Sequence, residues 1–365
     1  PCVAQTLGLL DALLTKWQAA GKQVHLQFLL DRCNQLGAWD LGIHSQCDVE
    51  NMLLQCEDQQ MGMLYVVGED PLLSCPDGVR VQKALQKLDL LVVQDVFMSA
   101  TAMAADVVLP GFTFAESAGT FTNNEGRVQR VRPIYPPPDK SIMSSIIYPP
   151  QSQLKAKRDT DIFNGIASTL GKDLALNSLE EVFGEIARRV PAYGSIKLSQ
   201  LGEDGLLSIR EAIKEPSKKL TGEPRPESSF KQASPSDSDQ KASANTFSLI
   251  SGNCLFHSAY LTEHSPTLMS ISGQAYVELN ELDASELSLS DKDRVTVTSP
   301  NHSASLMLKC NKQFPRGVAF IPENFHGVRL NRFIQNHEYP CTVTISQDIS
   351  SDELSTAKEG TGDTA

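Results

Sequence analysis

Short apolar runs that end at polar residues recur in the first third of the chain. Residues 90–93 read Leu-Leu-Val-Val and stop at a glutamine and an aspartate, and residues 63–67 form a second run that ends in Gly-Glu-Asp-Pro. Such runs are typical of strands buried on both faces of a parallel sheet. A third run, at residues 107–109, closes against Pro110, which cannot donate a hydrogen bond to a neighbouring strand. The pattern predicts an α/β fold with a doubly wound, mostly parallel sheet.

Apolar residues at spacings of three and four predict the helices that accompany these strands. The predicted helices cover residues 3–20, 49–60, 78–87, 161–170 and 178–190, and a further strand is predicted at residues 24–30.

The stretch at residues 111–129 contains three glycines and many side chains that donate or accept hydrogen bonds. We expect it to form a polar loop after the last strand, of the kind that holds a polar ligand.

A different pattern begins near residue 246. Alternation of apolar and polar side chains predicts short strands, with one helix among them. The strands are predicted at residues 247–251, 275–279, 294–298, 303–309 and 317–321, and the helix at residues 283–289. These elements predict a second, smaller β-rich domain.

Composition divides the chain into four parts. Residues 1–213 carry the α/β pattern, interrupted by an irregular, proline-bracketed excursion at residues 133–153. Residues 214–245 are rich in Pro, Ser and charged residues and nearly free of aliphatic ones, so they are predicted to be a disordered linker. Residues 246–347 form the β-rich domain, and the polar tail at residues 348–365 is predicted to be disordered.

Charge and hydropathy narrow the classes of partner. The 365 residues carry a formal net charge of −12, which argues against nucleic acid as a partner. We expect no direct membrane insertion, because no apolar stretch approaches the roughly 20 residues that a membrane helix needs. The chain starts at Pro1 without a methionine, from which we expect a fragment or a processed piece of a longer protein.

The eight cysteines are scattered singly, and none of them forms a C-x-x-C pair. Metal and cluster sites need ligands at closer, regular spacings. We therefore expect no metal ligands and no iron–sulfur cluster bound wholly by this chain, and instead free thiols in a reducing compartment.

Two ordered motifs resemble the molybdopterin oxidoreductase superfamily. Residues 95–110 read D-x-F-x-S-x-T-A-x-x-A-D-V-V-L-P, and residues 116–129 read E-x-x-G-T-F-T-N-x-E-G-R-V-Q. The E-G-R form at residues 125–127 is most similar to the large iron–sulfur subunit family of NADH:quinone oxidoreductase, respiratory complex I. The β-rich part resembles the dinucleotide-binding double-psi barrel at the C-terminus of molybdopterin enzymes.

The resemblance implies a set of cofactor-binding positions, vestigial in the complex I branch, and no catalytic residue. These positions are Glu69, Asp70, Asp95, Gly119, Thr120, Asn123 and Arg127. Acidic residues at the carboxyl end of a parallel strand are well placed for a ribose or a base edge, although Glu69 and Asp70 could equally cap the following helix. We expect any nucleotide to lie over these residues, between the α/β domain and the barrel. His257 is expected at the surface.

Two departures from the superfamily pattern bear on cofactor binding. Lys292 stands where the superfamily commonly has glycine, and Ser251, Gly252 and Asn253 replace a T-G-R that contacts the cofactor in metal-loaded members. Loss of the arginine removes a bidentate phosphate donor, so a pyranopterin dinucleotide would be held more weakly.

The function implied is a non-catalytic scaffold within NADH:quinone oxidoreductase, with iron–sulfur clusters in an N-terminal part that is absent here. Its partners would be other subunits of a respiratory complex, at the cytoplasmic face of the bacterial plasma membrane or the matrix side of the mitochondrial inner membrane. A first alternative is part of a molybdopterin-dependent oxidoreductase such as formate dehydrogenase, with molybdopterin guanine dinucleotide as cofactor. A stand-alone binding module is a second.

Overall fold

The chain forms two compact units. In the computed structural model, one unit comprises residues 1–68 and 89–232, and the other comprises residues 69–88 and 233–365. The structure describes residues 13–17, 19–22, 32–43, 49–134, 156–208, 245–258, 260–325, 327–334 and 341–348. The strand predicted at residues 24–30, most of the predicted linker and excursion, and nearly all of the predicted tail lie outside these described ranges.

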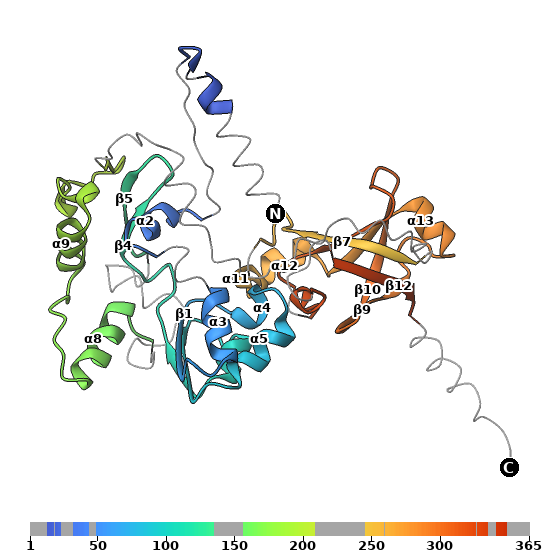
Figure 1. Ribbon diagram of the computed structural model, residues 1–365, viewed down its shortest axis with the longest axis horizontal. Coiled ribbons are helices and arrows are strands. Elements are labelled where there is room, and N and C mark those ends of the chain that lie inside the picture. Colours follow the sequence, from blue (N-terminus) through green and yellow to red (C-terminus); the bar gives the residue numbers. More distant parts are fainter. Residues whose placement is uncertain are drawn as a thin grey trace, which may run out of the picture. The chain divides into compact units, whose positions relative to one another are not determined.

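The first unit is built on a three-stranded parallel sheet, drawn in blue to teal in Figure 1. Its strands, in spatial order, are β1 (Met63–Val67), β2 (Leu90–Asp95) and β3 (Val107–Pro110). The central strand is the most buried, as its apolar run predicted. Helix α6 (Ala100–Ala104) follows it, and the Ser99 side chain accepts a hydrogen bond from the Ala102 N–H at the helix start. The parallel sheet is confirmed.

The polar loop expected after β3 is partly wrong, because much of it is a β hairpin. Strands β4 (Gly119–Thr122) and β5 (Arg127–Val131) pair antiparallel, and the short β6 (Leu206–Leu207) extends the sheet. Val128 of β5 is fully buried in a cluster with Phe183 and Tyr193. The alternation that makes a strand was present in the sequence, but it is short and flanked by glycine and asparagine residues that indicate a loop.

Three helices of the first unit agree with predicted ones within a few residues: α3 (Val49–Glu57), α8 (Asp159–Thr169) and α9 (Leu179–Arg189). The helix α2 (Gln35–Asp40) was not predicted. The 3-10 turns η3 (Pro191–Tyr193) and η4 (Leu198–Gln200) follow α9.

The second unit holds a closed six-stranded barrel, drawn in yellow to red in Figure 1. Its strands are β7 (Thr246–Gly252), β8 (Tyr276–Asn280), β9 (Arg294–Ser299), β10 (His302–Asn311), β11 (Val318–Pro322) and β12 (Cys341–Gln347). Around the barrel the order is β10, β8, β11, β7, β12 and β9. Five of the strands were predicted, whereas β12 was missed. Leu279, Val295 and Ile321 are among the fully buried side chains of its core.

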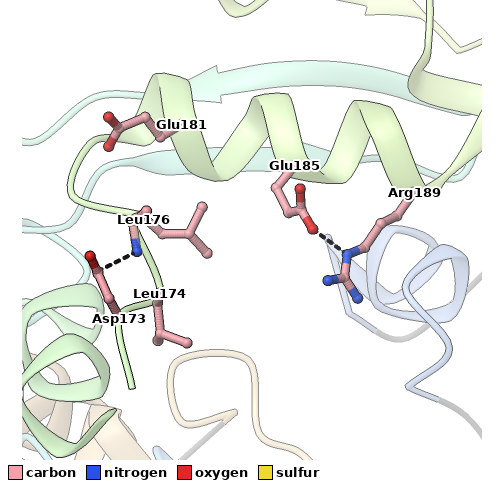
Figure 2. A pocket seen from close by; sticks show the side chains of 7 residues that line it. Asp173, Leu174, Leu176, Glu181, Glu185 and Arg189 are labelled. Carbon is pink, nitrogen blue, oxygen red and sulfur yellow. Dashed lines mark hydrogen bonds and ion pairs between the residues drawn. The ribbon is translucent and has the colours of Figure 1, made fainter. Parts of the chain in front are cut away.

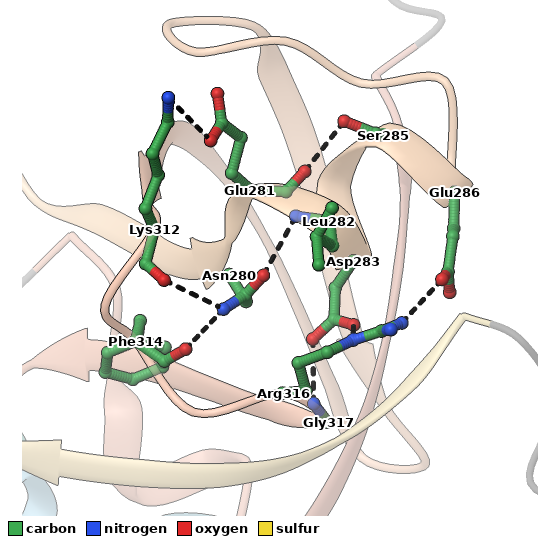
Figure 3. Close-up of polar contacts among 10 residues, drawn as sticks. All are labelled: Asn280, Glu281, Leu282, Asp283, Ser285, Glu286, Lys312, Phe314, Arg316 and Gly317. Atoms are coloured by element: carbon green, nitrogen blue, oxygen red, sulfur yellow. Dashed lines mark hydrogen bonds and ion pairs between the residues drawn. The ribbon is translucent and has the colours of Figure 1, made fainter.

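A short helix crosses one end of the barrel, and Figure 3 shows how side chains hold it. The Asn280 side chain caps α13 (Glu281–Glu286) by accepting from the Leu282 N–H, and it donates to the Phe314 carbonyl. Asp283, 5% exposed, accepts from Arg316 Nε and from the Gly317 N–H, each at 2.7 Å. The helix is therefore tied to the loop between β10 and β11.

The barrel unit also contains two helices that follow β1 in the sequence, α4 (Pro71–Ser74) and α5 (Gly78–Leu85). The side chain of Asn331, in η5 (Leu330–Arg332), donates to the carbonyls of Leu72 and Cys75 at 3.0 and 2.9 Å. A Cβ on Gly78 would lie 2.5 Å from the same amide nitrogen. Two further helices, α11 (Tyr260–Glu263) and α12 (Pro266–Ser272), complete this unit where it is described.

Candidate functional site

The two acidic residues after β1 have different environments. Asp70 is 2% exposed and precedes α4 without a side-chain capping bond, whereas Glu69 is exposed and accepts from the Asp70 N–H at 3.2 Å. Both belong to the barrel unit, while the other predicted site residues belong to the sheet unit.

At the carboxyl end of β2, Asp95 is 4% exposed and its Oδ1 accepts from the Val96 N–H at 2.6 Å. Its neighbour Gln94 is also buried and donates from Nε2 to Asp159 Oδ1 at 2.6 Å. The Tyr65 hydroxyl donates to the Gln94 amide oxygen. These bonds tie β1, β2 and the start of α8 together.

Burial, with a contribution from Asp159, raises the pKa of Tyr65, so its phenol stays protonated and can donate. Sequence reasoning missed Tyr65, Gln94 and Asp159. A buried glutamine at a strand end is a weak signal, and its partner lies 65 residues further along the chain.

The predicted site residues 119, 120, 123 and 127 all belong to the β4–β5 hairpin. Gly119 and Thr120 pair with Val131 and Arg130 across it. The Asn123 side chain accepts from the N–H groups of Glu125 and Arg127, both at 3.0 Å, which shapes the turn.

Arg127 is held by the same hairpin region. It donates to the Asp204 carbonyl at 3.3 Å and lies 3.7 Å from the Glu125 carboxylate. Both Asn123 and Arg127 therefore have structural roles in the turn.

The helix α2 and the residue before it support this hairpin. Asn34 Oδ1 accepts from the Thr122 N–H at 2.8 Å. The Tyr193 hydroxyl lies 2.9 Å from Thr122 Oγ1 and donates to Asp40 Oδ2 at 2.6 Å. A Cβ on Gly37 would lie 2.4 Å from Asn34 Oδ1, so glycine is needed there.

In the barrel unit, the side chains at the end of β7 decide whether a phosphate could bind there. The Ser251 hydroxyl donates to Glu323 at 2.6 Å, and Asn253 Oδ1 accepts from Asn324 at 2.8 Å. Residues 251–253 carry no cationic side chain, and their closest charged partner is a carboxylate. A phosphate needs hydrogen-bond donors and positive charge, so this strand end does not fit one.

The expectation of a surface position for His257 is wrong. The residue is fully buried. The centres of its ring and the Phe325 ring lie 4.4 Å apart in an edge-to-face arrangement, and its Nδ1 is hydrogen-bonded to Thr262 Oγ1 at 2.5 Å. These contacts come from α11 and from the loop after β11. The residues next to His257 in the sequence give no sign of them.

A hollow of about 570 Å³ lies beside α9, and Figure 2 shows the side chains around it. It is lined by Asp173, Leu174, Ala175, Leu176, Glu181, Glu185 and Arg189. Its carboxylates already have partners: Asp173 accepts from the Ala175 N–H, and Glu181 from the N–H groups of Asn177 and Ser178, which lower the pKa of Glu181. None of the predicted site residues lines it.

Within the ranges that the structure describes, no group of three or more His, Cys, Asp or Glu residues could hold a metal ion. No helix of the described part is long and apolar enough to cross a membrane.

Comparison with known proteins identifies the family. The model of the molybdopterin oxidoreductase family matches residues 3–148, and that of the molydopterin dinucleotide binding domain matches residues 247–350. The chain belongs to the molybdopterin oxidoreductase superfamily. The G 2 subunit of the NADH-quinone oxidoreductase of Rhizobium meliloti is 37% identical to it over 95% of the chain, which covers 41% of that relative.

Other members of the molybdopterin oxidoreductase superfamily are also similar. The alpha subunit of F420-dependent formate dehydrogenase 1 of Methanococcus maripaludis is 31% identical over 73% of the chain and 39% of the relative. Acetylene hydratase from Pelobacter acetylenicus shares the fold, with a TM-score of 0.61, 14% identity, and coverage of 81% of this chain and 46% of that one. The chain thus spans about two fifths of the length of the curated relatives.

Proposed function

We propose that the chain is a non-catalytic scaffold portion of the large iron–sulfur subunit of an NADH:quinone oxidoreductase. On this proposal it supports electron transfer from NADH to quinone, which runs through iron–sulfur clusters bound by other parts of the longer protein. The similarity to the Rhizobium meliloti NADH-quinone oxidoreductase relative over 95% of the chain supports this choice. The superfamily alone does not distinguish it from formate dehydrogenase, since similarity to a formate dehydrogenase alpha subunit covers 73% of the chain.

The observation that carries the proposal is the end of β7. The hydroxyl of Ser251 is bonded to the Glu323 carboxylate, and Asn253 stands at the position where metal-loaded members of the superfamily have an arginine. A pyranopterin dinucleotide carries phosphates, which a carboxylate repels and which an arginine would bind bidentately. This strand end favours a scaffold over a loaded cofactor site.

The predicted binding residues support the same choice. Asn123 and Arg127 are engaged in the hairpin turn, and Asp95 bonds to the backbone beside it. We propose that these positions, with Glu69, Asp70, Gly119 and Thr120, are vestiges of a dinucleotide site. We also propose that the six-stranded barrel has the double-psi form.

The scaffold would have other subunits of a respiratory complex as partners. We place it at the cytoplasmic face of a bacterial plasma membrane or at the matrix side of the mitochondrial inner membrane. The alternative is a part of a molybdopterin-dependent oxidoreductase such as formate dehydrogenase, with which the family match of both units is equally consistent.

Metal analysis of the intact protein, purified with its natural partners, separates the two functions. The scaffold proposal predicts iron without molybdenum or tungsten, together with NADH-dependent quinone reduction. Molybdenum or tungsten at about one atom per chain, with formate oxidation, would overturn it and establish the alternative.

The exposed Asn253 offers a matched variant. Asn253→Ala should leave quinone reduction unchanged, because no cofactor contact is lost. A fall in activity with loss of bound pterin would instead show that residues 251–253 hold a cofactor.

A further inference from the structure

Two segments of the barrel unit that are far apart in the sequence pack against each other, and neither contains an acidic residue. One is residues 78–87, which include α5, and the other is residues 327–334, which include η5. The contact between them is close, because a Cβ on Gly78 would lie 2.5 Å from the amide nitrogen of Asn331. The fold therefore brings together two stretches without negative charge.

The two segments carry the cationic residues Arg80, Lys83, Lys87, Arg329 and Arg332. We call these five residues the basic surface. Their charge contrasts with that of the whole chain, which contains 44 acidic residues and has a formal net charge of −12. The acidic residue that precedes α5, Asp77, is buried and accepts from the Arg80 N–H at 3.2 Å. Negative charge is thus concentrated elsewhere on the protein.

Arg332 is held in place where the two segments meet. Its Nη2 donates to Gln82 Oε1 at 2.9 Å, and its backbone N–H donates to the Arg329 carbonyl at 2.9 Å. Its Nε is buried and has no hydrogen-bond partner in the part of the chain that the structure describes. An unpaired donor on a buried charged group is costly, so the guanidinium retains bonding capacity for an acceptor on another molecule.

The positive charges of this region lack partners of opposite charge. Among the residues that the structure describes, no carboxylate forms an ion pair or a hydrogen bond with Arg329, Arg332 or Lys83. By contrast, Arg316 of the same unit pairs with Asp283 at 2.7 Å. Burial, together with the nearby charge of Arg329, lowers the pKa of Arg332, although an arginine stays protonated at neutral pH. Like charges held together in this way favour the binding of an anionic group.

The basic surface suits an extended acidic peptide better than a nucleic acid. Arg80 and Lys83 are three positions apart on α5, and Lys87 follows in the turn at its end, so positive charge runs along the helix. Single-stranded nucleic acids are held largely by stacking of their bases on aromatic side chains. Residues 78–87 contain no aromatic residue, and the aromatic residue of the second segment, Phe333, is 1% exposed.

We propose that the basic surface is a docking site for an extended acidic segment of a partner protein. Carboxylates of that segment bind the guanidinium groups of Arg329 and Arg332, and further carboxylates lie along α5. Arginine presents its donors in a planar fork that matches a carboxylate, which gives the contact its geometry. Attraction between opposite charges speeds the encounter, and salt weakens it. This docking does not depend on the function proposed above.

The test measures binding of a fluorescein-labelled oligoglutamate peptide to the full 365-residue chain by fluorescence anisotropy. We expect saturable binding at low salt that is lost at high salt, although the chain as a whole is acidic. An oligothymidylate of the same length and label should bind more weakly, because the surface offers its bases no aromatic platform. Absence of saturable peptide binding at low salt, or tighter binding of the oligothymidylate, would overturn the proposal.

Charge-removing substitutions locate the peptide on the protein. Arg332→Gln should weaken peptide binding about tenfold, the usual effect of losing a hydrogen bond to a charged group. Arg329→Gln and Lys83→Gln, at exposed positions where folding is not at stake, should each weaken it about threefold. Lys312→Gln is the matched control, because it removes an exposed lysine that pairs with Glu281 in the same unit, and it should leave binding unchanged. If Arg329→Gln and Lys83→Gln, shown to be folded by circular dichroism, bound the peptide as tightly as Lys312→Gln, the assignment would be wrong.

Discussion

Single residues show where this chain departs from its superfamily. Lys292 has a φ of +72°, in the left-handed region that favours glycine, and its N–H donates to the Leu308 carbonyl at 2.8 Å. The superfamily commonly has glycine at this place, and the structure supplies the reason. For a residue with a Cβ, this conformation costs about 1 kcal/mol or more.

Lys292→Gly should therefore stabilise the barrel unit. We expect a net gain of about 0.5 kcal/mol in the free energy of unfolding, since relief of strain exceeds the added entropy of the unfolded chain. Chemical denaturation followed by circular dichroism measures it. Lys312→Gly is the control. Lys312 does not have a left-handed conformation, so glycine there relieves no strain and the variant should be less stable than the native chain. A loss of stability in Lys292→Gly would contradict the interpretation.

Among the elements, α9 is the one that local sequence determines most fully. Ser178 and Glu181 form a reciprocal capping box at its start, and Arg188 and Arg189 lie in its last turn, where positive charge complements the helix dipole. Phe183 is buried in the core below it. Each of these features acts within one or two turns, so the helix was predicted within one residue at each end.

Glu185 makes α9 sensitive to acid. Hydrogen bonds from Arg188 and Arg189 lower the pKa of Glu185 to about 2. Because the pKa is lower in the folded state than in the unfolded state, ionised Glu185 stabilises the folded helix above about pH 4.5. This contribution to the free energy of unfolding is lost as the pH falls toward 2. An NMR titration of the Glu185 carboxyl carbon should show the low midpoint.

The double variant Arg188→Ala/Arg189→Ala should return the Glu185 midpoint toward 4.5. Added salt should raise the midpoint in the native chain, because the two arginine side chains that pair with Glu185 are exposed to solvent. A midpoint near 4.5 at low salt in the native chain would contradict the ion pairs.

For the whole molecule, the division into units does not follow chain order. Residues 69–88 lie between two strands of the parallel sheet in the sequence, yet they pack with the barrel. Asn331 makes the connection by donating to the carbonyls of Leu72 and Cys75, which precede it by 259 and 256 positions. Losing this side chain removes both hydrogen bonds that it donates, at a cost of about 1–3 kcal/mol.

Asn331→Ala should accordingly raise the hydrogen exchange rates of α4 and α5 without changing those of β2. Exchange measured by mass spectrometry on the full chain resolves the two segments. Asn301→Ala, which alters an exposed turn of the same barrel, should leave both segments unchanged. Equal acceleration of exchange in α5 and β2 would show that residues 69–88 are held by the sheet unit instead.

At the level of the fold, local sequence alone specifies the elements with strong periodicity. The three parallel strands, α5, α8, α9 and five barrel strands follow from apolar runs, alternation and caps, all of which are legible over about ten neighbouring residues. The superfamily motifs are equally local, and the family match confirms them.

Long-range contacts settle which of these elements pack together and what the polar side chains do. The hairpin at β4–β5, the strand β12, the burial of His257 and the membership of α4 and α5 in the barrel unit all depend on partners distant in sequence. The same holds for Asn123 and Arg127, whose bonding capacity is engaged by the turn that they shape. Hydrogen bonds and burial are properties of contacts, and contacts between distant residues leave no periodic trace in a single chain.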